Sequence, residues 1–441
     1  MKLVDIGVAK DIVVDILSKY TEFPKSIRML VRSAESERAM RDDVRGYVRS
    51  RSLGVVKFLN TIDYIVARAL ERRSFSEISQ RDRSLLRLAT YEGRWLNTSL
   101  EKIRTRLLGR ASHLFETTRR VLELDLEAAV RRLKPINALS VKLSHPTFLV
   151  ELLLENLRHD DALALMNHNN GLRNYYLRVN RLLEGHENVI KSLEKKDVRL
   201  TPEVGIPNLY KVVDCVDRLF SSSEFTSGQV LIQDKGSVEV VRALDPQPGM
   251  RIWDACAAPG MKTQLLWEFM NLEGQLDATD INPKRLEVAK RRCDSLGCQD
   301  VSFLMADAAE APVRDADKIL IDAPCSSTGM LRSHPSFKWR LNKQTLFSLM
   351  SIQNKILDGV LDAYADRPGT EIVYATCSLL PHEGESQIDS AMTRHSFELL
   401  EIPIDGSRGY DGFNCSEKAV RLFPHRHDSN AFFIARLRII D

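Results

Sequence analysis

Residues 318–329 read Lys318-Ile-Leu-Ile-Asp-Ala-Pro-Cys-Ser-Ser-Thr-Gly329, and this stretch predicts the fold of the larger part of the chain. A short apolar run ends abruptly in Asp322 and Cys325, which is typical of a buried strand that leads into a loop. A second stretch of the same kind, residues 371–378, carries Cys377 at its end. Open α/β sheets place their chemistry at the carboxyl ends of strands, so we expect this acid and these two thiols there.

The sequence around these two stretches alternates between strands and helices from about residue 225 onward. Strands are predicted at 250–254, 275–280, 301–304, 318–322 and 371–376, and helices at 262–270, 284–296 and 341–365. Two apolar β-rich runs follow at 420–423 and 431–440. This alternation indicates an α/β domain with a parallel sheet over residues 225–441.

Two further segments precede this domain. Residues 1–138 have apolar positions at spacings of three and four and few Gly or Pro residues, which predicts an all-helical bundle. Lys134-Pro135 marks a boundary because a residue before proline disfavours helix. Residues 139–224 read as a small α+β module, with strands at 175–180 and near 209–213.

Composition narrows the classes of protein. The chain has 441 residues, 44% of them hydrophobic and 28% charged, which suits a globular protein of several domains. No apolar run approaches the roughly 20 residues that cross a bilayer, and the acidic N-terminus lacks signal-peptide features. The seven cysteines form no Cys-x-x-Cys pair or zinc-type cluster, so we expect reduced thiols, no metal, and a cytoplasmic monomer.

Charge is distributed unevenly. Residues 1–150 carry 29 Lys and Arg residues against 18 Asp and Glu residues, a net charge of +11, and the rest carries −8. A basic half favours a polyanionic partner such as RNA or DNA, although an Arg-rich solvated surface gives the same count. Residues 81–91 form one predicted amphipathic helix with its basic residues outside, which suits either interpretation.

Three strand ends suggest a nucleoside ligand. Small residues and a helix start follow Asp254, so that backbone N–H groups can approach a carboxylate or phosphate. Asp280 closes the second strand, where an acid binds ribose hydroxyls, and Asp307 closes the third, near an adenine edge. Without a phosphate loop, this order favours S-adenosylmethionine. The candidate cofactor residues are Cys256, Ala257, Ala258, Pro259, Gly260, Met261, Lys262, Asp280, Asp307 and Asp322.

Four motifs in order resemble the Sun family of RNA cytosine-5 methyltransferases. They are Asp254-Ala-Cys-Ala-Ala-Pro-Gly, Asp322-Ala-Pro-Cys-Ser, Thr376-Cys-Ser and Pro381-His-Glu-Gly-Glu. The basic helical N-terminus resembles the NusB-like domain of RsmB-type members. The resemblance implies a Rossmann-like class I methyltransferase domain at 225–441, a small α+β RNA-binding module at 139–224 and an all-α NusB-like RNA-binding bundle at 1–138.

The resemblance also implies roles for the catalytic candidates. Cytosine carbon 5 is a poor nucleophile, and addition of a thiolate at carbon 6 makes it reactive. The family assigns that thiolate to Cys377, and Cys325 is implied to assist release of the methylated RNA. Asp322 is placed to bind the ring nitrogen 3 and the exocyclic amine, and Lys262 is our candidate for a nearby positive charge.

Residues 332–340 interleave basic and aromatic side chains just beyond the Cys325 loop. Such a segment suits phosphate contacts and base stacking, which makes His334, Lys338 and Trp339 candidate RNA-binding residues. A basic loop with a core tryptophan is the alternative interpretation.

The chain departs from the family pattern at two places. Met261 replaces a second glycine, which would be strained if that position needed a positive φ. Asn430-Ala-Phe-Phe replaces Asp-Gly-Phe-Phe near the C-terminus.

Several interpretations stay open on sequence alone. Ribosomal RNA is the family-based substrate, and transfer RNA is the alternative. In a second interpretation, Cys325 serves as nucleophile in the Pro-Cys pair, as in DNA cytosine methyltransferases. A catalytically silent RNA-binding assembly factor is the third interpretation.

Overall fold

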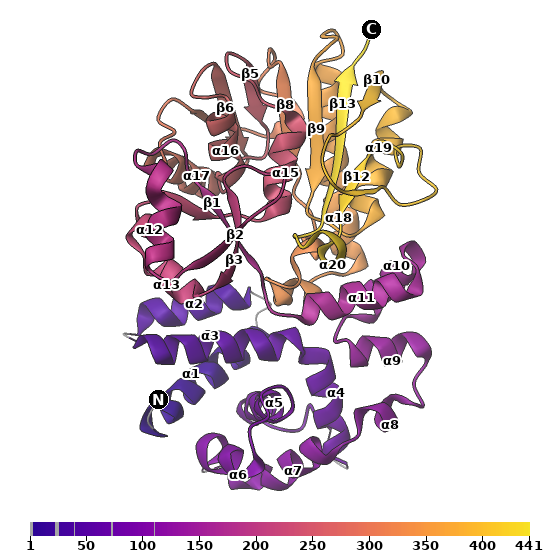
Figure 1. Ribbon diagram of the computed structural model, residues 1–441. Helices are drawn as coiled ribbons and strands as arrows, with labels where there is room; N and C mark the ends of the chain where they lie inside the picture. Colours follow the sequence, from indigo (N-terminus) through magenta and orange to yellow (C-terminus); the bar gives the residue numbers. More distant parts are fainter. Residues whose placement is uncertain (1–2, 23–25, 39, 72–73, 110) are drawn as a thin grey trace. The chain divides into compact units, whose positions relative to one another are not determined.

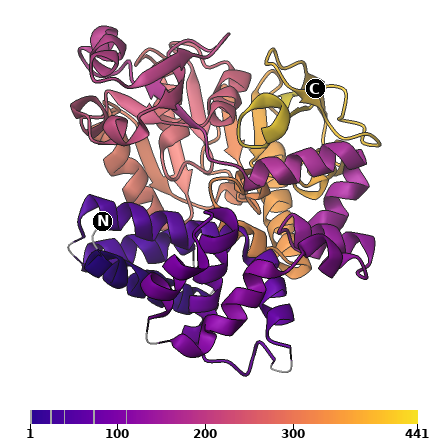
Figure 2. The same cartoon turned by 60° about the horizontal axis from the view of Figure 1, so that its bottom comes forward.

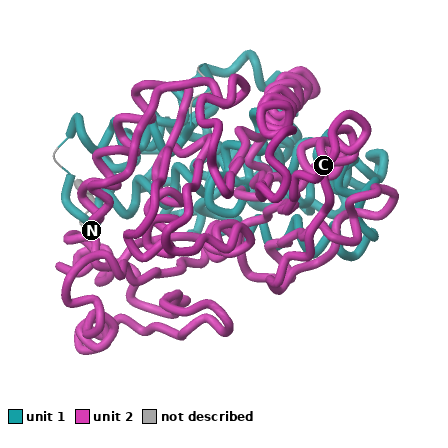
Figure 3. The backbone as a smooth tube through the Cα atoms, turned by 90° about the horizontal axis from the view of Figure 1, so that it is seen from above, with its two compact units in different colours: residues 1–171, 331–341 teal, residues 172–330, 342–441 magenta. Residues whose placement is uncertain are grey.

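The computed structural model describes residues 3–22, 26–38, 40–71, 74–109 and 111–441. The chain divides into two compact units, coloured separately in Figure 3. Unit 1 consists of residues 1–171 and 331–341, and unit 2 consists of residues 172–330 and 342–441.

Unit 1 is helical (Figures 1 and 2). Its longer helices are α1 (Leu3–Glu22), α2 (Ile27–Glu37), α3 (Asp42–Lys57), α4 (Leu59–Ala69), α5 (Gln80–Trp95), α7 (Phe115–Glu123), α9 (Pro135–Lys142), α10 (Thr147–Asn156) and α11 (His159–Asn170). The short elements are α6 (Leu100–Ile103), η1 (Arg104–Leu108), η2 (Ser112–Leu114), α8 (Leu126–Val130) and η6 (Pro335–Trp339).

Helix α5 forms the centre of unit 1, with its residues from Ser84 to Glu92 all buried. A side chain on Gly54 of α3 would collide with the Tyr91 ring, so glycine permits the close packing of α3 and α5. The prediction that the basic residues of this helix lie outside is wrong for Arg87. That guanidinium is only 6% exposed and forms a two-pronged ion pair with Asp63, at 2.7 and 2.8 Å.

Unit 1 extends beyond the boundary predicted at residue 138. Helices α9–α11 belong to it because polar side chains of α4 bind the backbone of α9. Asn60 donates to the Ser140 carbonyl at 3.0 Å, and the Thr61 hydroxyl donates to the Val141 carbonyl at 2.5 Å. The Lys134-Pro135 pair therefore starts a helix within the unit and does not separate two units.

Unit 2 begins with a four-stranded antiparallel sheet of order β2-β3-β1-β4. Its strands are β1 (Tyr175–Val179), β2 (Arg199–Pro202), β3 (Leu209–Asp214) and β4 (Val230–Ile232). The turn η3 (His186–Asn188) and helices α12 (Val189–Lys195), α13 (Val216–Phe220) and α14 (Ser223–Thr226) connect them. This is the α+β module, but it shares a compact unit with the sheet that follows.

The larger sheet of unit 2 has nine strands in the order β11-β12-β13-β9-β8-β5-β6-β7, with β10 paired to β13. The parallel strands are β5 (Arg251–Asp254), β6 (Gln275–Asp280), β7 (Ser302–Met305), β8 (Lys318–Asp322) and β9 (Glu371–Thr376). The others are β10 (Phe397–Leu400), β11 (Ser407–Arg408), β12 (Val420–Leu422) and β13 (Phe432–Ile439). Chain order reverses between β5 and β8, which is where doubly wound sheets bind ligands.

Helices cover both faces of this sheet (Figure 1). One core packs strand residues such as Ile252 and Leu320 against α15 (Lys235–Leu244), α16 (Met261–Phe269) and α17 (Pro283–Ser295). The other core packs Trp253 and Ile321 against α18 (Lys343–Ala363) and α19 (Glu385–Met392). Successive strand residues thus bury opposite faces, as a central parallel sheet requires. The predicted α/β fold with a helical N-terminal part is confirmed.

Among the described residues, we find no helix that combines the length and the apolar character needed to cross a bilayer.

Candidate active site

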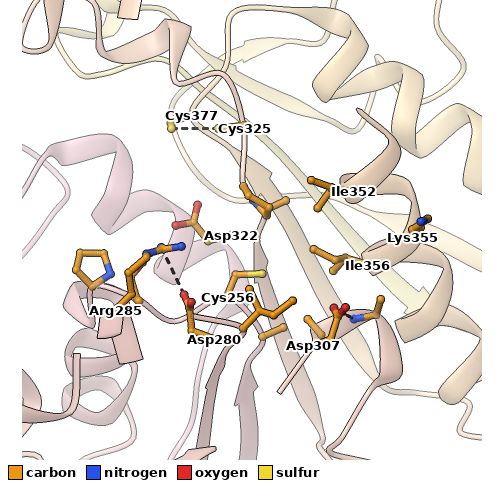
Figure 4. Close-up of a pocket in the computed structure, with 18 of the residues that line it drawn as sticks. Cys256, Asp280, Arg285, Asp307, Asp322, Cys325, Ile352, Lys355, Ile356 and Cys377 are labelled. Carbon is orange, nitrogen blue, oxygen red and sulfur yellow. Dashed lines mark hydrogen bonds and ion pairs between the residues drawn. The ribbon is translucent and has the colours of Figure 1, made fainter. Parts of the chain in front are cut away.

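A cavity of about 690 Å³ opens at the carboxyl ends of the parallel strands in unit 2 (Figure 4). Loops after β5, β6, β7, β8 and β9 and one face of α18 line it. Its polar and thiol lining includes Cys256, Asp280, Asp307, Asp322, Cys325 and Cys377. This volume lies within the range of small-molecule sites.

The two thiols at one end of the cavity are adjacent. Cys325 Sγ lies 3.3 Å from Cys377 Sγ, and Cys377 Sγ lies 3.5 Å from the Ser327 hydroxyl. The hydrogen bond with Cys325 lowers the pKa of Cys377; burial opposes this shift and Lys262 adds to it. The same hydrogen bond, together with burial, raises the pKa of Cys325 well above its ordinary value. Because the two sulfurs share one hydrogen bond, ionisation of one favours the protonated form of the other, and the charge of Lys262 favours ionisation at Cys377.

A carboxylate and an ammonium lie next to these thiols. Lys262 Nζ, near the start of α16, donates to Asp322 Oδ2 at 2.6 Å. Burial opposes the charged form of Lys262, but Asp322 and Cys377 outweigh it and raise the pKa of the lysine. Lys262 thus stays protonated between an acid and a thiolate.

The other end of the cavity carries two more strand-end acids (Figure 4). Asp280 closes β6, is 4% exposed, and has Oδ2 3.4 Å from the Arg285 guanidinium. Asp307 follows β7 and caps the short helix η4 (Ala308–Glu310) by accepting the Ala309 amide. Both carboxylates keep acceptor capacity toward the cavity, which suits hydroxyl and amine donors.

The loop between β5 and α16 resolves the question raised by Met261. The positive φ of this turn, 91°, falls on Gly260, and Met261 is the first residue of the helix. A side chain on Gly260 would also come within 3.0 Å of the Ala289 carbonyl. Position 260 therefore requires glycine, whereas the backbone of Met261 is helical and not strained.

Most predicted site residues meet at this cavity, and some do not line it. Cys256, Ala258, Pro259, Asp280, Asp307, Asp322, Cys325 and Cys377 line it, whereas Ala257, Gly260, Met261 and Lys262 lie behind. Burial and the neighbouring Asp254 raise the pKa of Cys256 far above its ordinary value. Cys256 is consequently a lining thiol rather than a thiolate.

Sequence reasoning missed several lining residues. Arg285 lies on α17, and Ile352, Lys355 and Ile356 recur on one side of α18. The spacing on α18 was visible in the sequence, but a predicted helix does not reveal which strand end it faces. Ser327, with a φ of 57°, belongs to the Cys325 loop and was not singled out.

The predicted RNA-binding residues of segment 332–340 lie in unit 1. Lys338 is fully buried, and its ammonium donates to the Lys57 carbonyl, the Ser144 carbonyl and Asn170 Oδ1. The prediction of a phosphate contact is corrected for Lys338, because no surface of its side chain is left to meet RNA.

The other two candidate RNA-binding residues of this segment, Trp339 and His334, have different surroundings. The Trp339 indole donates to the Val56 carbonyl at 2.7 Å and packs on the core of unit 1, so the alternative interpretation, a core tryptophan, describes it better. His334 is half-buried and stacks on Phe337, with ring centroids 5.3 Å apart.

Within the described residues, no group of three or more His, Cys, Asp and Glu side chains is arranged to hold a metal ion.

Comparison with known proteins identifies both parts of the chain. The family described as 16S rRNA methyltransferase RsmB/F matches residues 241–438, and the NusB family matches residues 8–102. The ribosomal RNA small subunit methyltransferase B of Photorhabdus laumondii is 34% identical over 278 residues, a match that covers 62% of this chain. The human 28S rRNA (cytosine(4447)-C(5))-methyltransferase is 27% identical over 316 residues, covering 68% of this chain.

The chain spans 61% of the length of the Photorhabdus protein and 38% of the human protein. Among solved structures, the crystal structure of PH0851 aligns with a TM-score of 0.77 and 25% identity, over 99% of both chains. The resemblance read from the four motifs is thereby confirmed. The RsmB/F family is therefore what residues 241–438 are similar to, and the NusB family is what residues 8–102 are similar to.

Proposed function

We propose that this protein transfers a methyl group from S-adenosylmethionine to carbon 5 of a cytosine in ribosomal RNA. The observation that carries this proposal is the pair of thiols 3.3 Å apart at the ends of β8 and β9, beside the Asp322–Lys262 ion pair. The names of the relatives support the reaction and the RNA class: one is a small subunit methyltransferase, and another is a 28S rRNA cytosine-C5-methyltransferase.

Cys377 is the proposed nucleophile. Its thiolate forms a bond to carbon 6 of the cytosine, and the electron pair of the 5,6 double bond becomes available at carbon 5. The lowered pKa of Cys377 supports this role because the thiolate is the reactive form. Once carbon 5 carries the methyl group, its proton passes to a base supplied by solvent, and the electron pair of that C–H bond restores the 5,6 double bond. The electron pair of the sulfur–carbon bond then leaves with sulfur and regenerates the Cys377 thiolate.

Cys325 is proposed to take part in that release. Its raised pKa keeps it a neutral thiol beside the adduct sulfur, 3.3 Å away in the free enzyme. Asp322 accepts hydrogen bonds from the base, and Lys262 stabilises both this carboxylate and the neighbouring thiolate. Together, these four side chains bind the cytosine, form the covalent adduct and release the methylated product.

The cavity fits S-adenosylmethionine, which supplies an electrophilic methyl group when bound. Asp280 is buried at the end of the second parallel strand, where a carboxylate accepts both hydroxyls of a ribose. Asp307 lies at the end of the next strand, beside the apolar face that Ile352 and Ile356 give to a planar ring. The start of α16 directs backbone N–H groups toward a carboxylate.

We also propose that the protein works in the cytoplasm. All seven cysteines are free in the structure, which fits a reducing compartment. The net charge of +11 over residues 1–150 supports unit 1 as a contributor to RNA binding. Transfer RNA remains the alternative substrate that the experiment below distinguishes.

Two other interpretations lose support. A Pro324–Cys325 nucleophile would need its charge stabilised at Cys325, yet the nearby ammonium acts on Cys377: against burial, Asp322 and Cys377 raise the pKa of Lys262. A silent assembly factor was suggested by Met261, but the backbone there is an ordinary helix start.

The test is S-adenosylmethionine-dependent formation of 5-methylcytosine. Purified protein is incubated with unmodified ribosomal RNA and, separately, with unmodified transfer RNA, and bisulfite sequencing locates the product. We expect one methylated cytosine in ribosomal RNA, lost with Cys377→Ala. Methylation of transfer RNA alone would identify transfer RNA as the substrate. Methylation of neither RNA would contradict the proposal.

A further inference from the structure

One buried carboxylate ties together the two loops that carry the active-site cysteines. Glu383 ends the short helix η7 (Pro381–Glu383) and has no exposed surface. Its Oε1 accepts the Ser326 amide at 2.8 Å, and its Oε2 accepts the Ser326 and Ser378 hydroxyls, each at 2.5 Å. Gln353 of α18 completes the set by donating to Oε1 at 3.1 Å.

These donors flank the two thiols directly. Ser326 follows Cys325 in the chain, and Ser378 follows Cys377. The Glu383 carbonyl also accepts the Thr376 hydroxyl at 3.2 Å, so residues on both sides of Cys377 are bound to this one glutamate. The separation of the two sulfurs therefore depends on a group that touches neither of them.

An ionised carboxylate suits this network. All four groups bound to the side chain donate to it, and a carboxylate offers only acceptors. A glutamine would remove the charge and place its NH2 group toward the two hydroxyls, which would have to rotate and accept instead of donate. Its charge also reaches the thiols, because Glu383 contributes to the raised pKa of Cys325.

A neighbouring acid shows what a purely structural buried carboxylate looks like here. Glu385 is equally buried, but its charge is matched by the Arg421 guanidinium through bonds of 2.6 and 2.5 Å. The Glu383 carboxylate instead accepts hydrogen bonds from neutral groups: two hydroxyls, a backbone amide and a side-chain amide. Burying a carboxylate without a cation costs stability. A role in the site explains that cost.

We propose that Glu383 is a positioning residue, which holds the Cys325 and Cys377 loops in register, so that the two sulfurs stay 3.3 Å apart and differ in reactivity. This inference rests on the proposed function for its consequence in catalysis, but its effect on the thiols is independent of any RNA.

The experiment measures the two thiols one at a time. The full-length protein is alkylated with iodoacetamide between pH 6 and 10, and peptide mass spectrometry gives the rate at Cys377 and at Cys325. For the unchanged protein we expect Cys377 to react faster at pH 7. Glu383→Gln should lower the ratio of the two rates at least tenfold, and the kcat of RNA methylation should fall about 100-fold with KM for RNA nearly unchanged.

Two variants make the result specific. Glu385→Gln, at the matched buried carboxylate, should lose stability yet keep the ratio of alkylation rates. Ser378→Ala keeps the Glu383 charge and removes one bond to the Cys377 loop, so kcat should fall about tenfold while the ratio changes less than in Glu383→Gln. Ser378→Ala also answers the question if Glu383→Gln fails to fold.

The inference is overturned if folded Glu383→Gln keeps the original ratio, or if Ser378→Ala matches the unchanged protein in both measurements. Failure of the proposed function would look different. The unchanged protein would then methylate no RNA, while Glu383→Gln would still lower the ratio of the alkylation rates at Cys377 and Cys325.

Discussion

Cys325 and Cys377 stand at equivalent places, each just beyond the end of one of two neighbouring parallel strands, yet their surroundings give them opposite tendencies. The sulfur of Cys377 is favoured as a thiolate and that of Cys325 as a thiol. The motifs predicted which residues meet at this edge. The family resemblance assigned the thiolate to Cys377, but the residue types alone did not, because ionisation depends on hydrogen-bond partners from other elements.

Lys262 is expected to contribute to the pH dependence of the reaction. The hydrogen bond with Cys325 lowers the pKa of Cys377, and the charge of Lys262 lowers it further, so the thiolate, and with it the rate, is present above that pKa and is lost as pH falls through it. Lys262→Met should move this acidic limb of the kcat profile upward by about one pH unit, as loss of a nearby opposite charge does.

The matched control is Lys355→Met, a lysine of α18 that also lines the cavity and takes no part in the Lys262–Asp322 ion pair. Its acidic limb should stay in place. A limb that does not move in Lys262→Met, measured from pH 5.5 to 9, would exclude Lys262 as the group that stabilises the thiolate.

At the scale of elements, the parallel strands were predicted well and the antiparallel ones less well. Predicted strands 275–280, 318–322 and 371–376 coincide with β6, β8 and β9, because short runs that alternate with predicted helices are distinctive. Strands β2 and β4 were missed: β2 is mostly exposed and ends in Pro202, and β4 has three residues. Short edge strands form through pairing with neighbours, which local sequence does not reveal.

One buried ion pair joins the α+β module to the helix behind the cofactor loop. Arg178 of β1 donates to Glu268 of α16 at 2.6 Å, with side chains 2% and 4% exposed, and to Gln233 at 2.6 Å. Arg178→Met leaves Glu268 buried without its partner, which should cost about 3–5 kcal/mol in the free energy of unfolding, measured by urea denaturation.

The exposed pair Arg199–Asp214 in the same small sheet is the control. Arg199→Met should cost less than about 1 kcal/mol, as exposed pairs do. Equal losses in the two variants would contradict the importance assigned to the buried pair. The double variant Arg178→Met/Glu268→Leu should recover part of the loss, because no unpaired charge then remains.

At the scale of the whole molecule, the sequence predicted the order of helical, α+β and α/β segments but not their grouping. Three predicted segments become two units, and residues 331–341 leave unit 2 to complete the core of unit 1. A basic, aromatic stretch has the same composition on an RNA-binding surface and in a protein core. Lys338 belongs to the core because three carbonyl groups from distant parts of unit 1 converge on its ammonium.

The proposed reaction depends on different roles for the two thiols, and trapping the covalent complex tests these roles most directly. Each variant is incubated with substrate RNA and S-adenosylmethionine, and denaturing electrophoresis separates free protein from protein bound to RNA. We expect Cys325→Ala to accumulate a covalent RNA–protein complex, because Cys377 still attacks and release is impaired. Cys377→Ala should form none, and accumulation in Cys377→Ala with none in Cys325→Ala would contradict the assignment.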